Sequence, residues 1–356
     1  MILEYLPYDV QLPARYDHPK VAVRNYLKYI ASVSLILLLA PGPLQFARGK
    51  RPLLSPTQEK SKPPKAIEEQ DQGIELSSKL VNVFFNVTDQ RGAYLTDLRK
   101  EEIQVLEDKK SQEIFSFSRQ TDLPLTISVL IDVSGSEQFV LPLLKSAATQ
   151  FFRSFVRPDK DVVSIAEFRD ETTLLQDFTA TTGRLEKALE NVRYTRPTAR
   201  DSSSHFGGTS LFDAIYVTCE ESLARQAGRR TIILLTDGDD TTSTYKAHDA
   251  IDRALRTDVT IYAIGIGDQI FRGVDEGTLK RLSSETGGRA YFPRKETDLT
   301  TAFKQIENEL RTQYYIAYYP SNSAQDVSYR SIQILIPARE KLRITHRRGY
   351  YASRAK

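Results

Sequence analysis

The chain has 356 residues, of which 40% are hydrophobic and 27% charged, and its formal net charge is +3. This composition excludes a chain that is disordered throughout. Lys and Arg are scattered and form no basic stripe, which argues against a nucleic-acid-binding protein. The single Cys219 excludes an internal disulfide framework and a four-cysteine zinc site. The four His residues show no ligand spacing, which argues against a histidine-based zinc site.

The amino-terminal segment, residues 1–47, has the features of an export signal. Its apolar stretch, residues 29–40, follows basic residues and is broken by Pro41. A membrane-spanning helix needs about 20 apolar residues, so this stretch is short for a span. We expect a cleaved secretory signal, with an uncleaved membrane anchor as the alternative. Residues 48–76, rich in Pro, Lys, Gln, Glu and Ser, predict a disordered linker.

Two short β-rich segments flank a central region. The first, residues 77–121, contains strand candidates at 80–88, 103–106 and 114–117. The second, residues 313–356, contains candidates at 314–319, 329–337 and 342–346. Neither segment is long enough to bury a core alone. Because the two ends of an inserted domain often emerge close together, we expect both segments to pair into one small β-sandwich.

The central region, residues 122–312, alternates between strand and helix patterns. Such alternation predicts an α/β fold, with a doubly wound, Rossmann-like parallel sheet and helices on both faces. The expected strands are residues 125–132, 162–168, 174–178, 232–235 and 260–266, with a short one near Tyr291. The expected helices are 139–155, 185–192, one from Thr209, 279–286 and 299–310.

Acidic and hydroxyl side chains follow the buried strands of this predicted sheet. Asp132 ends the strand LTISVLID, and Ser134 and Ser136 come next; Asp237 follows a second apolar strand, and Thr209 follows a glycine turn. The carboxyl ends of parallel strands form the ligand crevice of such folds, so we expect these oxygens to converge. An oxygen-only site suits Mg²⁺, or Mn²⁺ or Ca²⁺ in its place. The neighbouring Asp239 and Asp240 are expected to be solvated loop acids.

This pattern resembles the metal-ion-dependent adhesion site (MIDAS) of von Willebrand factor type A (VWFA) domains. The resemblance spans about residues 125–311 and rests on D-x-S-x-S at 132–136, on Thr209 in GGTSLFDAI and on Asp237 in LLTDGDD. It implies that the three hydroxyls are direct or near-direct metal ligands and that the two carboxylates act largely through water. The flanks EEIQVLEDKKSQEIFSFSR and HRRGYYA resemble bacterial, acidobacterial-type VWFA-related proteins. Glu137 stands where relatives often have Met.

The resemblance implies a non-enzymatic, adhesion-type module whose metal keeps one position open for an Asp or Glu of a partner protein. We expect a bacterial periplasmic, envelope or extracellular protein, since secreted animal domains usually carry disulfides. We expect membrane contact only through an uncleaved amino-terminal segment. One alternative is a structural scaffold with a stabilising metal. The other is a hydrolase with Asp132 or Ser134 as nucleophile, for which only His205 is a candidate histidine base.

Overall fold

The computed structural model describes residues 80–119, 122–134, 141–193, 208–267, 273–322, 324 and 326–352. These residues all belong to one compact unit, Gly73–Lys356. The expected export segment and linker lie outside the described residues. Within the described ranges, no helix combines the length and the apolar character needed to cross a membrane.

The central sheet has six strands in the order β10-β9-β8-β5-β6-β7. Their bounds are β5 (Leu125–Asp132), β6 (Val162–Phe168), β7 (Thr172–Thr179), β8 (Arg229–Thr236), β9 (Val259–Gly265) and β10 (Ala290–Tyr291). All neighbours run parallel except β6 and β7, which are antiparallel. The predicted doubly wound, mainly parallel sheet is therefore confirmed, with one antiparallel strand, β7, at its edge. The connection from β6 to β7 spans only residues 169–171, too few for the crossover that parallel strands require.

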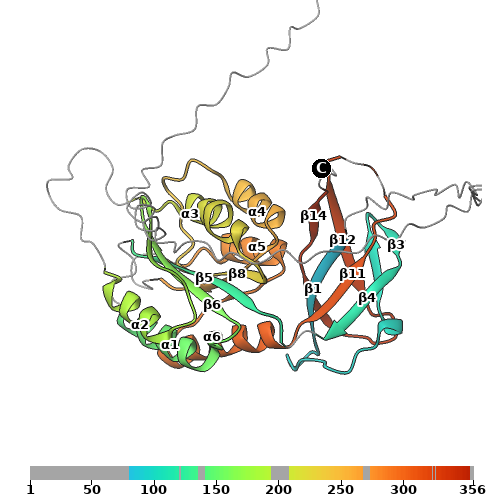
Figure 1. Ribbon diagram of the computed structural model, residues 1–356, viewed down its shortest axis with the longest axis horizontal. Helices are drawn as coiled ribbons and strands as arrows, with labels where there is room; N and C mark the ends of the chain where they lie inside the picture. Colours follow the sequence, from blue (N-terminus) through green and yellow to red (C-terminus); the bar gives the residue numbers. More distant parts are fainter. Residues whose placement is uncertain are drawn as a thin grey trace, which may run out of the picture. The chain divides into compact units, whose positions relative to one another are not determined.

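Helices cover both faces of this sheet, as the doubly wound prediction requires (Figure 1). One face packs against α1 (Leu141–Phe155), α2 (Thr182–Asn191) and α6 (Glu296–Arg311). The other packs against α3 (Leu211–Val217), α4 (Ala247–Arg256) and α5 (Glu276–Thr286). Helix α3 continues into the short turns η4 (Thr218–Ser222) and η5 (Leu223–Arg225). All eight residues of the central strand β5 are buried, which explains its nearly unbroken apolar sequence.

The two flanking segments together form two four-stranded antiparallel sheets, in the orders β13-β1-β11-β4 and β14-β12-β2-β3. Their elements are β1 (Val81–Thr88), η2 (Lys100–Glu102), β2 (Gln104–Glu107), β3 (Lys110–Gln112), β4 (Ile114–Arg119), β11 (Tyr314–Tyr318), β12 (Tyr329–Leu335), β13 (Arg343–His346) and β14 (Gly349–Tyr351). Each sheet contains strands of both segments, which pair directly as β1 with β11 and β13, β4 with β11, and β2 with β12, so the predicted pairing of the flanks is confirmed. One apolar core, which includes Phe85, Ile316 and Ile334, is shared by the two sheets. Neither segment could bury these side chains without the other.

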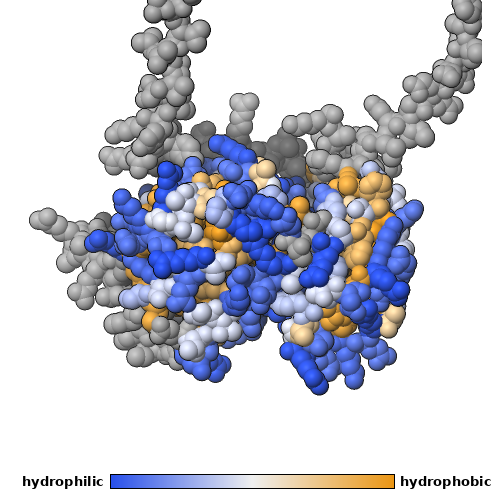
Figure 2. Space-filling view, turned by 60° about the horizontal axis from the view of Figure 1, so that its bottom comes forward, coloured by the Kyte–Doolittle hydropathy of each residue, from blue (hydrophilic) through white to orange (hydrophobic). Residues whose placement is uncertain are grey.

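Most of the surface seen in Figure 2 is hydrophilic, and apolar residues show through in patches, among them patches on the β-sandwich. Among the exposed large apolar side chains are Phe115 (62%) and Tyr319 (41%). Their rings contact each other edge to face, with centroids 5.1 Å apart. This contact reduces the apolar area that each ring presents to water.

Candidate metal site

Asp132 is fixed at the carboxyl end of the central strand. It is the last residue of β5, and its side chain is fully buried. Its Oδ1 accepts a hydrogen bond from the backbone N–H of Ser134 (2.9 Å), and its Oδ2 accepts one from Oγ1 of Thr236 (2.6 Å). The first bond closes a tight turn after the strand, and the second joins β5 to the end of β8. The carboxylate is therefore held at the ligand edge of the sheet.

Asp237 brings a second carboxylate to the same edge. Its side chain is 2% exposed, and its Oδ1 accepts a hydrogen bond from the backbone N–H of Asp239 (3.0 Å). Burial raises the pKa of Asp132 to about 6, and the nearby charge of Asp237 contributes to the rise. Hydrogen bonds from Thr236 and Ser134 act in the opposite direction but are outweighed. Two buried acids within electrostatic reach of each other make a site where a bound cation is favoured.

Backbone hydrogen bonds place the loop of Thr209 beside the turn after β5. The N–H of Val133 donates to the carbonyl of Phe168 (3.0 Å), and the N–H of Ser210 donates to the next carbonyl, that of Arg169 (2.6 Å). Both loops are therefore attached to consecutive residues at the end of β6. The side chain of Thr209 is 5% exposed.

The same loop is also attached to the segment after β8. The carbonyl of Thr209 accepts hydrogen bonds from the N–H groups of Thr241 (2.9 Å) and Thr242 (3.2 Å), and its own N–H donates to Oγ1 of Thr241 (2.9 Å). Gly208 permits this approach, because a Cβ there would lie 2.1 Å from Cγ2 of Thr242. Thr209 thus lies between the loops that carry Asp132 and Asp237.

Four of the five predicted site residues lie within the described part of the chain, and Ser136 lies outside it. Direct contacts or charge interactions join Asp132, Ser134 and Asp237, while Thr209 is attached to both neighbouring loops. Carboxylate and hydroxyl oxygens are the donors that a hard cation such as Mg²⁺ prefers, so these residues fit the implied metal. Among the described residues, no three His, Cys, Asp or Glu side chains form a metal-binding group.

Two polar residues have roles that the sequence reading missed. Thr236 donates to Asp132 and accepts a hydrogen bond from the N–H of Gly238 (3.1 Å), so it fixes both the acid and the following turn. The role of Thr236 could have been inferred from its position at the end of an apolar strand, directly before Asp237. Asp240, expected to be a solvated loop acid, is a partly exposed loop residue that has a further role in supporting α3. Its Oδ1 accepts a hydrogen bond from the N–H of Phe212 (3.2 Å) at the start of α3.

Comparison with known proteins identifies the domain but not a close relative. No curated protein sequence matches this chain. Solved structures that resemble part of this chain include three examples from different organisms. The mussel byssus proximal thread matrix protein 1, described with a zinc-occupied MIDAS motif, is 16% identical, covers 56% of this chain and 49% of its own, and has a TM-score of 0.45. BatB from Bacteroides thetaiotaomicron is 16% identical over 53% of this chain and 97% of its own, with a TM-score of 0.42.

The third structure, a von Willebrand factor type A protein from Catenulispora acidiphila, is 12% identical over 79% of this chain and 76% of its own (TM-score 0.43). This chain thus spans about half the length of the mussel protein. The sequence model of the von Willebrand factor type A domain matches residues 126–305, just over half of the chain. The chain belongs to the von Willebrand factor type A domain family.

Proposed function

We propose that this chain is an exported, metal-dependent protein-binding module of the adhesion type. The hydroxyls of Ser134, Ser136 and Thr209, with the carboxylates of Asp132 and Asp237, hold Mg²⁺, or Mn²⁺ or Ca²⁺. An Asp or Glu of a partner protein completes the coordination. The observation that carries this proposal is the buried carboxylate of Asp132, held by neutral donors beside a second buried acid.

The neutrality of these donors is the reason to expect a metal. The backbone N–H of Ser134 and the hydroxyl of Thr236 orient the carboxylate of Asp132 without supplying a full positive charge. Burial of two neighbouring acids is costly unless a cation offsets them. A divalent ion supplies that charge and, when neutral hydroxyls are its direct ligands, keeps a net attraction for an incoming carboxylate.

A binding role fits these residues better than catalysis. Asp132 is fully buried, and each of its oxygens accepts a hydrogen bond, which leaves it poorly placed for attack on a substrate. Ser134 is only 4% exposed. We therefore propose a non-enzymatic module. Its location in the periplasm, the envelope or outside the cell rests on the sequence of residues 1–47 alone.

The test is calorimetric titration of MgCl₂, MnCl₂ and CaCl₂ into the metal-free protein and its variants. Asp237→Asn and Thr209→Val should each weaken metal binding about tenfold or more, since each removes a ligand or its support. Asp177→Asn is the matched control, because Asp177 is an exposed acid on β7 at the edge of the sheet. Equal metal affinity in all four proteins would remove the site assignment.

A second experiment separates adhesion from a structural role for the metal. The immobilised protein is exposed to bacterial envelope extract in MgCl₂ and in EDTA. Capture of a protein in MgCl₂ alone, lost in Asp237→Asn, supports adhesion. A metal-dependent rise in melting temperature with no captured protein supports the scaffold alternative.

A further inference from the structure

A cavity of about 290 Å³ lies at the opposite end of the central sheet from the metal site. It is lined by residues at the starts of β8 and β9, by the end of α4 and by residues of the β-sandwich. Three of its lining residues are arginines (Arg229, Arg230 and Arg347), and one is an acid, Asp258. Apolar side chains, among them Phe84 and Leu255, line the rest. The cavity therefore combines an excess of positive charge with an apolar wall.

The acid offsets these charges only in part. Asp258 Oδ1 accepts a hydrogen bond from Nη1 of Arg347 (2.5 Å), whereas its Oδ2 lies 3.7 Å from Nη2 of Arg230, beyond hydrogen-bond distance. The side chain of Asp258 is 62% exposed, while those of Arg347 and Arg230 are 13% and 21% exposed. Water screens the acid more than the two guanidiniums, so one carboxylate does not neutralise both.

Arg229 adds a third positive charge whose bonded partners are neutral. Its Nη1 donates to the carbonyl of Leu310 (3.0 Å) and its Nη2 to the side-chain oxygen of Gln313. Its guanidinium lies 5.0 Å from the ring centroid of Phe84. The residue is 8% exposed, and burial lowers its pKa to about 10. These partners orient the guanidinium but carry no charge, and the carboxylate of Asp161, which also acts on Arg229, is shared with Arg157 and Arg311, so the charge of Arg229 is offset only in part.

We infer that this cavity binds a small organic anion, whose phosphate or carboxylate group contacts Arg230 and Arg347 and whose apolar body packs against Phe84 and Leu255. Guanidinium pairs bind such oxyanions through charge-assisted, often bidentate hydrogen bonds. The volume is close to the lower limit of ligand sites, about 300 Å³, and so fits a single ring or short chain. This site is independent of the metal site, because it lies at the amino ends of the strands.

The probe is phenyl phosphate, titrated calorimetrically into the full chain in EDTA so that no metal ion can hold it. Inorganic phosphate tests the charge alone, and benzyl alcohol tests the apolar contact alone. We expect phenyl phosphate to bind about tenfold or more tightly than either fragment, because only it uses both parts of the cavity. Absence of phenyl phosphate binding, or equal affinity for inorganic phosphate, would overturn the inference.

Two substitutions should act in opposite directions. Arg230→Gln should weaken phenyl phosphate binding about tenfold or more, through loss of a charge-assisted contact. Asp258→Asn should strengthen it severalfold, because it removes the competing carboxylate; Asn tolerates the left-handed backbone found there (φ 51°).

The controls repeat each charge change elsewhere on the surface. They are Arg184→Gln on α2 and Asp177→Asn on β7, both exposed. Equal effects of the control and cavity substitutions, or weaker binding by Asp258→Asn, would contradict the assignment. Circular dichroism checks that each variant is folded, and if Arg230→Gln is not, Asp258→Asn decides the question.

Discussion

Two buried aspartates at opposite ends of neighbouring strands of the central sheet differ sharply in their chemistry. Asp132 ends β5 at the carboxyl edge, and Asp161 immediately precedes β6 at the amino edge. Both side chains are 0% exposed. Burial raises the pKa of Asp132 to about 6. Burial also acts to raise the pKa of Asp161. Hydrogen bonds from Arg157 and Arg311 outweigh that effect and lower the pKa to about 2.

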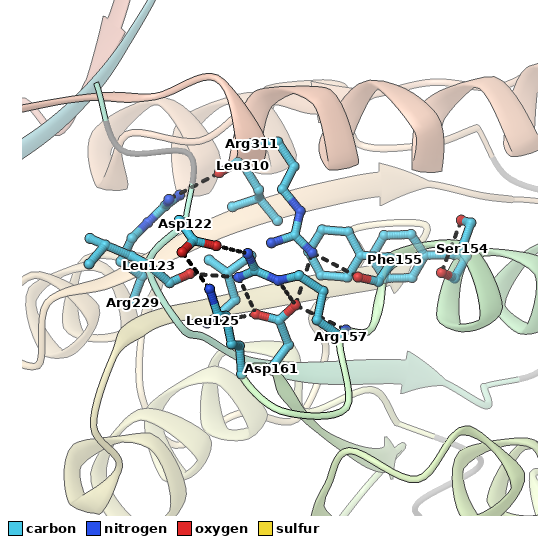
Figure 3. Close-up of polar contacts among 12 residues, drawn as sticks. Asp122, Leu123, Leu125, Ser154, Phe155, Arg157, Asp161, Arg229, Leu310 and Arg311 are labelled. Carbon is cyan, nitrogen blue, oxygen red and sulfur yellow. Dashed lines mark hydrogen bonds and ion pairs between the residues drawn. The ribbon is translucent and has the colours of Figure 1, made fainter. Parts of the chain in front are cut away.

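The partners of Asp161 explain the difference (Figure 3). Its Oδ2 accepts hydrogen bonds from Nε of Arg157 and Nη2 of Arg311 (2.9 Å each), and its Oδ1 accepts one from Nη2 of Arg157 (2.9 Å). The N–H of Leu125 also donates to Oδ1 (3.1 Å). One carboxylate therefore joins the start of β5, the segment after α1 and the end of α6.

The charge of the partners distinguishes a structural acid from a candidate metal-site acid. Asp161 is neutralised within the fold by two guanidiniums. Asp132 is oriented by a hydroxyl and a backbone N–H, which fix its geometry without offsetting its charge. A buried acid of the second kind is the better candidate for a cation taken from solution.

The largest effect is expected from Asp161→Asn. It should lower the free energy of unfolding by about 3 kcal/mol, because Arg157 and Arg311 lose their shared carboxylate. Urea unfolding followed by circular dichroism measures the change. The control is Asp122→Asn: Asp122 also bonds Arg157, but its side chain is 72% exposed, so little change is expected. Equal losses in the two variants would show that burial of the pair is unimportant.

The free energy of unfolding at low pH should depend on the same carboxylate, that of Asp161. Folding lowers the pKa of Asp161 from 3.8 to about 2, so its stabilisation is complete above the unfolded pKa. That stabilisation is lost as the pH falls from about 4 to 2. The free energy of unfolding should therefore decrease more steeply over this range in wild type than in Asp161→Asn. Parallel pH profiles would contradict the low pKa.

Asp132→Asn should behave differently from Asp161→Asn. In EDTA it should change the free energy of unfolding by less than about 1 kcal/mol, since it removes an uncompensated charge and keeps an oxygen for the N–H of Ser134. In MgCl₂ at about 100 times the dissociation constant, wild type should gain about 2.7 kcal/mol and the variant nothing. Thermal melts with and without Mg²⁺ measure both. A loss in EDTA as large as that of Asp161→Asn would make Asp132 a structural acid.

The positions of Asp132 and Asp237 were predictable from the sequence because both residues follow buried strands, whereas metal binding by them stays a prediction. In a parallel sheet, the end of an apolar run fixes where the next side chain lies, which is why Asp132 and Asp237 could be placed at one edge. The position of Thr209 could be predicted only with the help of the glycine turn that precedes it. The flanking sheets were predictable as a pair because each segment is apolar on one face and too short to cover it.

The features that were missed depend on contacts between distant segments. Nothing near Asp161 in the sequence indicates that Arg311, 150 positions away, donates to it. Helix α4 was not predicted, because its apolar side chains, such as Ile251 and Leu255, form only a short stripe. The antiparallel direction of β7 is different, because the expected strands left only residues 169–173 between them and the turn length could have indicated it.

The smallest effect is expected at Asp240, which lies three residues after Asp237 but supports α3 instead of the metal site. Asp240→Ala removes one of two acceptors for the N–H of Phe212, which also donates to Oγ of Ser243 (3.1 Å), so the loss of stability should be at most about 1 kcal/mol. Mg²⁺ affinity should stay near the wild-type value, whereas Asp237→Asn should lose it. Urea unfolding and calorimetry on the two variants measure both quantities. If Asp240→Ala weakens Mg²⁺ binding as much as Asp237→Asn, then Asp240 belongs to the metal site, and neutral partners alone do not identify the acids that hold the cation.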